Sequence, residues 1–199
     1  MCKYKFAFLM VLLCLSQIAQ SLGDPAEGRH KADMCTKCHG ADGISPDPNI
    51  PKLSGQTANF IVKEITEFQE GTRHNERMSK ISKMIENAQD LDDIAAYFAA
   101  KPMMKGQPTG SKPASEGKEL LTRGRCNYCH KEGGKLYSPF TAYPPPPLIG
   151  GQHKKYLIKA MKDIRDGNRP ADDYGLMMED LSQLSDIQID SIAEYLSGL

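Results

Sequence analysis

The sequence lacks three features that would point to common classes of protein. Its 25 basic residues are matched by 25 acidic ones, with no basic block or stripe, which argues against a nucleic-acid-binding protein. No apolar run reaches the roughly 20 residues that a membrane-spanning helix needs. No segment alternates apolar and polar residues convincingly, and no hairpin signal is present. The lack of strand signals, together with the helix signals described below, predicts an all-α globular protein.

The N-terminal residues have the pattern of a secretory signal peptide. Lys3 and Lys5 precede an apolar core of ten residues, Phe6 to Leu15, and small residues follow it up to Ser21. We therefore predict a signal peptide over residues 1–21, cleaved near Ser21, and a mature protein in the periplasm.

Two alternatives for this segment fit less well. A retained membrane anchor would need about twice the apolar length that is present. A lipoprotein would be processed at Cys14, but Leu13 precedes this cysteine where a small residue is expected. Export removes Cys2 and Cys14 and leaves four of the six cysteines in the mature chain.

The mature chain contains a repeat. The segment "CTKCHG" at Cys35–Gly40 recurs as "CNYCHK" at Cys126–Lys131. Downstream, "PKLSGQTANFIVKEITEFQEGTR" at Pro51–Arg73 matches "PLIGGQHKKYLIKAMKDIRDGNR" at Pro147–Arg169 without a gap. This agreement indicates a duplicated domain, in which the second copy gains length chiefly in the loop "PFTAYPPPP".

A segment rich in proline and glycine separates the two copies. Residues 101–114, "KPMMKGQPTGSKPA", show no periodic apolar pattern, so we predict a linker there. The two domains then cover residues 22–100 and 115–199. Domains of roughly 80 residues bury little apolar surface and usually need an additional stabilising element. A large apolar cofactor can provide it.

Capping signals indicate where the helices of each half begin. The predicted helix starts are Asp24, Thr57, Asp90, Ser115 and Ser185. The helix that opens at Asp24 is expected to run into Cys35, and the helix that opens at Thr57 is expected to be closed by Gly71. Gln188 should complete a capping box with Ser185.

Each copy begins with C-x-x-C-H, which is the attachment signature of c-type haem. Two thiols add across the two vinyl groups of one porphyrin, and the adjacent histidine reaches the iron. The motif assigns the thioether bonds to Cys35, Cys38, Cys126 and Cys129, and the proximal iron ligands to His39 and His130. The predicted cofactors are therefore two haem c groups.

Three other uses of the paired cysteines account for less of the pattern. A zinc site would need both pairs to converge and would leave the histidines unexplained. Export permits disulfides, but a disulfide would not explain why a histidine follows the cysteine pair in both copies. A thioredoxin-like redox pair would normally follow a strand, and no strand pattern is present.

A methionine in each half would complete the iron coordination, raise the reduction potential and close the site to substrates. In the first half the predicted ligand is Met78, with Ile81 one turn later, where it would pack beside the haem. Met84 is expected to be a core residue. Met103 and Met104 lie in the linker and are expected to fill gaps or face solvent.

The second half offers the doublet Met177-Met178. Met178 is the predicted ligand, because Leu181 at i+3 repeats the relation between the first ligand and the apolar residue one turn later. Met177 is the alternate, because its distance to Tyr195 matches the first half better. The methionine that does not bind iron is expected to pack in the core.

Three further histidines remain in the mature chain, His30, His74 and His153. They have no partners at ligand spacing, so we predict that all three are surface residues. His74 is close to the predicted methionine ligand in sequence and could compete for iron if the first domain loosened.

The order of these motifs resembles the periplasmic diheme cytochromes c of the c-four group. The segments "CHGADG … PKLSGQ … EGTR … M … DIAAYFA" and "CH … PLIGGQ … DGNR … MM … IAEYLSGL" carry the resemblance over essentially the whole mature chain. It implies two tandem class I cytochrome c domains related by a pseudo-twofold axis, with haem propionates near the interface. It also implies that the carbonyls of Pro51 and Pro147 accept the ring N–H of the proximal histidines.

The resemblance implies a one-electron carrier without catalytic residues, rather than an enzyme. Its donor would be a quinol–cytochrome c reductase of the cytochrome bc type. Its acceptor would be a terminal oxidase or a periplasmic reductase, so the protein would associate at most peripherally with membrane complexes.

Two alternative functions stay open. The chain is also similar to the diheme subunit of flavocytochrome c sulfide dehydrogenase, so its partner could be a flavoprotein dehydrogenase docked on the "YSPFTAYPPPP" loop. A diheme peroxidase would need one haem with an open ligand position, whereas each half offers a methionine.

Overall fold

The computed structural model describes residues 23–135, 146–171 and 175–199, which are helical and contain no β-strand. The predicted all-α fold class is confirmed. The predicted signal peptide and most of the proline-rich loop lie outside the described residues. Within the described ranges, no helix is both long and apolar enough to cross a membrane.

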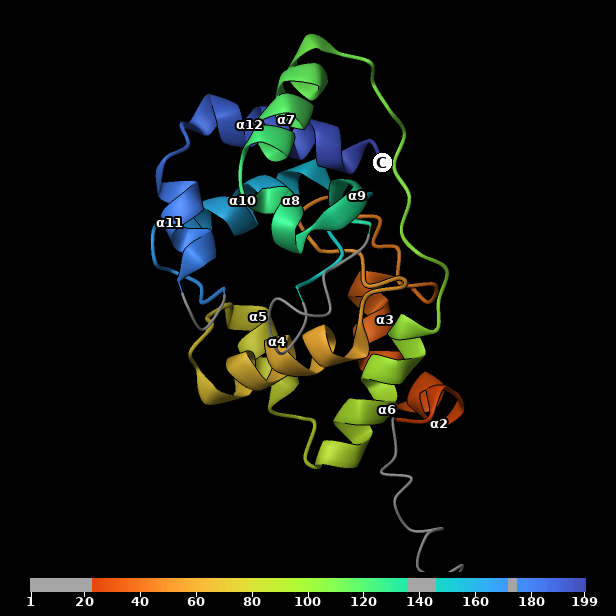
Figure 1. Cartoon of the computed structure of the whole chain (residues 1–199). Helices are drawn as coiled ribbons and strands as arrows, with labels where there is room; N and C mark the ends of the chain where they lie inside the picture. The colour runs from red at the N-terminus through yellow and green to blue at the C-terminus, as the bar shows by residue number, and fades with distance from the viewer. Residues whose placement is uncertain (1–22, 136–145, 172–174) are drawn as a thin grey trace, which may run out of the picture.

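The helices form two bodies that follow the two halves of the chain (Figure 1). The described helices of the first half are α2 (Pro25–Lys31), α3 (Asp33–His39), α4 (Ala58–Glu70), α5 (Glu76–Ser82) and α6 (Ala88–Ala99). Those of the second half are α7 (Lys112–Arg123), α8 (Cys126–Cys129), α9 (Lys131–Gly134), α10 (Lys154–Arg165), α11 (Leu176–Ser182) and α12 (Asp186–Ser197). In Figure 1 the first half lies below the second, and the connecting chain runs up one side to α7.

The first and last helices of each half pack against each other, α2 with α6 and α7 with α12. A glycine lies at each crossing. A Cβ atom on Gly28 would lie 1.9 Å from the carbonyl oxygen of Asp93, and one on Gly117 would lie 1.9 Å from that of Ser191. Only glycine allows backbones to approach this closely, so both halves depend on the same close crossing.

Each half has its own hydrophobic core, because one face of every longer helix is apolar. The first core includes Ile61, Ile65, Leu91, Ile94 and Phe98. The second core includes Leu157, Met161, Ile164, Ile189 and Leu196.

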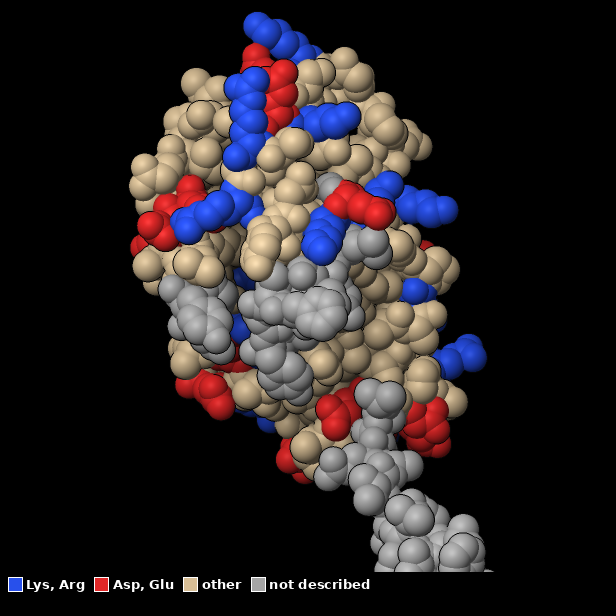
Figure 2. Space-filling view, in the orientation of Figure 1, with Lys and Arg blue, Asp and Glu red and all other residues tan. Residues whose placement is uncertain are grey.

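On the face shown in Figure 2, basic and acidic side chains of the described residues are interspersed, as the balanced composition leads one to expect.

Several predicted helix ends are confirmed. Asp24 Oδ1 accepts a hydrogen bond of 2.8 Å from the amide two residues later. Ser185 and Gln188 form the predicted capping box. Gly71 closes α4 in the left-handed conformation, with a φ of 80°. Thr57 is the N-cap residue of α4, but its side chain makes no capping hydrogen bond.

Three predicted boundaries are wrong. Helix α6 begins after Asn87, whose side chain caps it, and not at Asp90. Helix α7 begins after Ser111, which caps it, so Ser115 lies inside the helix and α7 starts within the segment predicted as linker. The helix before the first motif breaks at Ala32 into α2 and α3. At α6 and α7 an equally good cap residue lies a few positions earlier than predicted.

The linker is held by both halves. The side chain of Met104 is 1% exposed, and its amide donates to the carbonyl of Ser54 in the first half at 3.2 Å. The amide of Gly106 donates to the carbonyl of Leu199 in the second half, also at 3.2 Å. The linker therefore joins the two bodies through specific contacts as well as through the covalent chain.

Asp93 is a buried carboxylate that ties α6 to α2. It accepts hydrogen bonds from the amide of Asp24 at 2.7 Å and from Gln89 at 2.9 Å, and it pairs with Lys31. The hydrogen bond from Lys31 is the main cause that lowers the pKa of Asp93 to about 2. A carboxylate with a lowered pKa stabilises the fold above its usual pKa of about 4, and this contribution is lost as the pH falls.

Replacing Asp93 by asparagine is expected to lower thermal stability at pH 5 and to flatten the loss of stability between pH values of about 4 and about 2. The stabilising charge is then absent at every pH. Thermal unfolding followed by circular dichroism across this range measures both effects. Asp92→Asn, one residue earlier in α6, is the control and should keep the wild-type profile. A wild-type profile for Asp93→Asn would contradict the assignment.

Candidate cofactor site

One continuous cavity of about 1330 Å³ extends between the two halves. It is larger than the roughly 300–1,000 Å³ of a pocket for one small ligand. Its walls are mainly apolar and include core side chains from both halves, such as Ile61, Phe98, Leu157 and Leu181. Both C-x-x-C-H motifs line it. The cavity suits large apolar groups that each half attaches through its own motif.

The first motif lies on α3, which ends at His39. The imidazole of His39 is 7% exposed, and its Nδ1 lies 2.9 Å from the carbonyl oxygen of Pro51. Burial lowers the pKa of His39, so the ring is neutral and Nδ1 donates its hydrogen to the carbonyl. This tautomer leaves Nε2 as the nitrogen that can bind a metal.

The second motif repeats this arrangement. His130 directly follows α8 and is also 7% exposed. Its Nδ1 lies 3.1 Å from the carbonyl oxygen of Pro147, and burial lowers its pKa. The structure thus brings each predicted histidine to the predicted proline, which follows it by 12 residues in the first half and by 17 in the second.

All four cysteines of the motifs are free thiols that line the cavity. Burial is the main cause that raises the pKa of Cys35 to about 11, and it also raises the pKa of Cys126. Among the described residues, no three His, Cys, Asp or Glu side chains are grouped to hold a metal ion. The disulfide and zinc alternatives therefore find no support.

The predicted methionine ligands have different surroundings. Met78 on α5 lines the cavity, and so does Met177 on α11. Met178, the predicted ligand, is 46% exposed and does not line the cavity, so of the two candidates in the second half only the alternate, Met177, is placed there. Met84 is 62% exposed and is not a core residue as predicted, whereas Met104 is buried.

A buried charge cluster crosses the interface beside the cavity. Glu64 pairs with Arg73 of its own half and with Arg169 of the second half, the latter at 2.8 Å. Arg73 also donates to the hydroxyl of Tyr156 at 3.3 Å. Burial alone would raise the pKa of Tyr156, but the two arginines lower it to about 8. Nε of Arg169 is buried without a hydrogen-bond partner among the described residues, so a donor remains for an anionic group such as a haem carboxylate.

Gln56 and Gln152, which the sequence marks only as repeated positions, join the two halves. Gln56 Nε2 donates to the carbonyl of Leu148 at 2.8 Å, and its Oε1 accepts from the amide of Leu148 at 3.0 Å. Gln152 forms the same two bonds with Lys52, both at 2.9 Å. We call these four bonds the glutamine clamp. Sequence reasoning missed it, because the partner of each glutamine lies in the other half.

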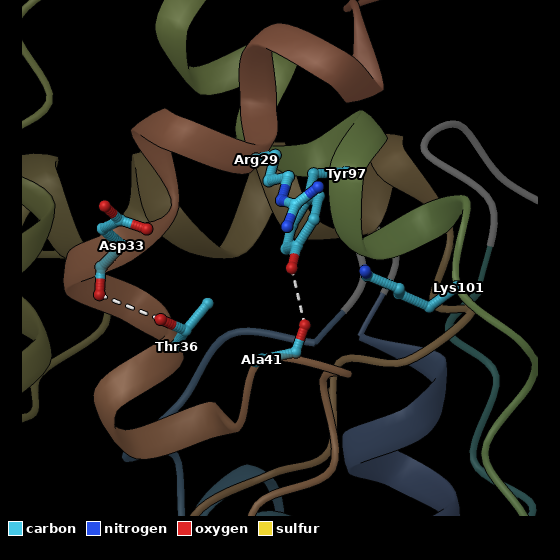
Figure 3. A pocket seen from close by; sticks show the side chains of 6 residues that line it. All are labelled: Arg29, Asp33, Thr36, Ala41, Tyr97 and Lys101. Carbon is cyan, nitrogen blue, oxygen red and sulfur yellow. Dashed lines mark hydrogen bonds between the residues drawn. The ribbon is translucent and has the colours of Figure 1, made fainter.

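Tyr97 fixes the chain that follows the first motif (Figure 3). Its hydroxyl donates to the carbonyl of Ala41 at 2.6 Å, and Nζ of Lys101 lies 4.0 Å from the centre of its ring. A small pocket around this contact is lined by Arg29, Asp33, Thr36, Ala41, Tyr97 and Lys101. It shares no lining residue with the large cavity, so Tyr97 supports the site from outside.

One of the three further histidines is not a surface residue. His153 is half-buried, and its Nε2 lies 2.9 Å from the carbonyl oxygen of Ser45 in the other half. The prediction is therefore wrong for His153, which contributes to the interface. His30 and His74 are exposed as predicted, and His74 lines the cavity.

Two similar helical halves that each present C-x-x-C-H and a proline-bonded histidine to an apolar cavity define a c-type cytochrome with two haems. Comparison with known families agrees. The family model described as Cytochrome c matches residues 26–100 and again residues 114–199. The chain belongs to the cytochrome c family.

Its relatives include proteins that match over most of the chain. Cytochrome c4 of Pseudomonas aeruginosa is 36% identical over 199 residues, which cover 96% of each chain. The thiosulfate dehydrogenase electron acceptor of Thiomonas intermedia is 30% identical over 84% of this chain and 79% of its own. The crystal structure of reduced recombinant cytochrome c4 from Pseudomonas stutzeri matches with a TM-score of 0.80 at 32% identity, covering 89% of this chain and 99% of that one.

These comparisons confirm four predictions. The resemblance to the c-four group holds over nearly the full chain, and the fold is that of two class I cytochrome c domains. The cofactors are two haem c groups. The protein transfers electrons and is not an enzyme.

Proposed function

We propose that this protein carries single electrons in the periplasm, from a quinol–cytochrome c reductase to a terminal oxidase or another periplasmic reductase. One observation supports a closed electron carrier above all. Each half brings a histidine and a methionine to the same cavity, His39 with Met78 and His130 with Met177. In each half the histidine and the methionine would hold the iron from its two sides and leave no position for a substrate, which argues against a diheme peroxidase.

The residues of the site have distinct roles in this proposal. A bound haem supplies one-electron chemistry through its iron. The thioether bonds are assigned to Cys35, Cys38, Cys126 and Cys129. Pro51 and Pro147 fix the tautomer and the orientation of the proximal histidines. The apolar walls exclude water, which favours the less charged reduced state.

The double variant Cys35→Ser, Cys38→Ser is expected to contain one haem per chain instead of two, because the first half loses both thioether bonds. The matched variant Cys126→Ser, Cys129→Ser should lose the other haem. A pyridine haemochrome assay against protein concentration measures the stoichiometry after periplasmic maturation. Two covalent haems in either variant would contradict the assignment, and none in the wild type would sink the proposed function.

A second candidate function is supported by the relative from Thiomonas intermedia, whose name describes an electron acceptor of thiosulfate dehydrogenase. By analogy, this chain would receive electrons from a periplasmic dehydrogenase as a lasting subunit of it. Gel filtration of the native protein separates the two candidates. Elution at the size of a single mature chain supports a mobile carrier, whereas co-elution with a dehydrogenase supports the second function.

A further inference from the structure

Each glutamine of the clamp binds the loop that orients the proximal histidine of the opposite half. Gln56 and Gln152 are 4% and 5% exposed, so their amides depend on these protein partners for hydrogen bonds. Each glutamine binds the residue directly after the histidine-bonded proline, Lys52 in one half and Leu148 in the other. The two halves therefore touch at the groups that orient their iron ligands.

One peptide group carries both contacts in each half. In the first half, the carbonyl of Pro51 accepts from His39 Nδ1, and the amide of the same Pro51–Lys52 peptide donates to Oε1 of Gln152. When its N–H is hydrogen-bonded, a peptide group is polarised and its carbonyl becomes a stronger acceptor. Gln152 thus strengthens the hydrogen bond of a histidine in the other half.

The second half has the mirror arrangement. The carbonyl of Pro147 accepts from His130 Nδ1, and the amide of the Pro147–Leu148 peptide donates to Oε1 of Gln56. A stronger acceptor at Nδ1 makes the imidazole a better electron donor to a metal on Nε2. Better donation favours ferric over ferrous iron and so lowers the reduction potential.

We propose that Gln56 and Gln152 are positioning residues that set the reduction potentials crosswise, each tuning the haem of the opposite half. The proposal rests on the assignment of His39 and His130 as iron ligands in the proposed function. It gives the interface a role beyond holding the halves together, because each domain needs the other to reach its own potential.

The test replaces each glutamine by leucine in the full diheme protein and resolves the two potentials by spectroelectrochemical titration. Gln152→Leu should raise the potential of the haem bound to His39. The expected change is about threefold in the ratio of reduced to oxidised haem at a fixed electrode potential, or roughly 30 mV at 59 mV per tenfold. Gln56→Leu should do the same for the haem bound to His130. In each variant the other haem should keep its potential.

A nuclear magnetic resonance signal identifies the affected half independently. In the reduced protein, the ring N–H proton of the proximal histidine should move upfield, because its hydrogen bond weakens. The movement should appear for His39 in Gln152→Leu and for His130 in Gln56→Leu. Gln107→Leu, which replaces an exposed linker glutamine, is the control and should move neither. Equal shifts at both haems, a shift in the glutamine's own half or no shift would overturn the proposal.

A further variant covers the case in which leucine prevents folding. Gln152→Asn keeps a buried amide but is one methylene shorter, so its Oδ1 is not expected to reach the amide of Lys52. It should show the same crosswise shift. The haemochrome assay separates this proposal from the proposed function. A wild type without two haems defeats the proposed function, whereas loaded variants without a crosswise shift defeat only the tuning role of the clamp.

Discussion

Replacing Met177 by leucine is expected to lower the reduction potential of the second haem by on the order of 100 mV and to let it bind carbon monoxide. Methionine donates through sulfur and raises the potential of a histidine-bound haem, and its loss opens one coordination position. Leucine has nearly the same volume, so the packing of Met177 against the second core should survive. Visible spectra with and without carbon monoxide, together with a redox titration, measure the effect.

The neighbouring methionine supplies the matched control. Met178→Leu should leave the spectrum, the carbon monoxide response and both potentials unchanged, because Met178 faces solvent. Met78→Leu should reproduce the Met177 effect at the first haem. If Met178→Leu opened the second haem and Met177→Leu did not, the placement of α11 against the cavity would be wrong.

Gly28→Val is expected to destabilise the first half by about 3 kcal/mol or more, which is a large part of the stability of a small domain. Even a Cβ atom at this position would lie 1.9 Å from the carbonyl oxygen of Asp93 and 2.9 Å from the Cβ atom of Tyr97. Helices α2 and α6 must therefore separate. Denaturant unfolding followed by circular dichroism measures the loss, and a lower yield of the holoprotein should accompany it.

The repeat allows the same experiment in the second half. Gly117→Val should destabilise the contact between α7 and α12 by a similar amount, because its Cβ would meet the backbone of Ser191. Ala26→Val and Ser115→Val place the same side chain on exposed positions of α2 and α7 and should change stability little. Stable, fully loaded Gly28→Val protein would show that the helices are not packed as closely as described.

The sequence alone predicted the parts of the site that depend on local chemistry. The C-x-x-C-H spacing is dictated by the porphyrin, so Cys35, His39 and their counterparts could be assigned without a structure. The repeat and the apolar periodicity were enough for the all-α class and the two halves. The pairing of His39 with Pro51 came from the family resemblance, and the structure shows the hydrogen bond itself.

The choice between the two methionines could not be made from spacing. Met177 and Met178 are adjacent on a helix and therefore point about 100° apart, so only one of them can face the cavity. Which one does so depends on how α11 packs against α10, a tertiary contact that the sequence does not reveal. Matching Leu181 to its first-half counterpart favoured Met178, whereas the structure places Met177 at the cavity.

The glutamine clamp was beyond sequence reasoning for a related reason. Its partners are 100 or 92 residues away and are backbone groups, which carry no residue signature. The helix starts at Asn87 and Ser111 were missed through competition between nearby polar residues, each a plausible cap.

The reciprocity of the glutamine clamp has a consequence for the behaviour of the protein at low concentration. A contact in which each side offers the same residue to the other is isologous, as in a C2 homodimer. Two separate chains joined in this way would part on dilution, whereas a short tether sets an effective concentration on the order of millimolar. The segment between α6 and α7 is such a tether. If the hydrogen bonds of the glutamine clamp break, the two halves remain close together and the bonds can form again quickly. The two halves of the chain therefore stay associated at any protein concentration, unlike the two subunits of a dimer.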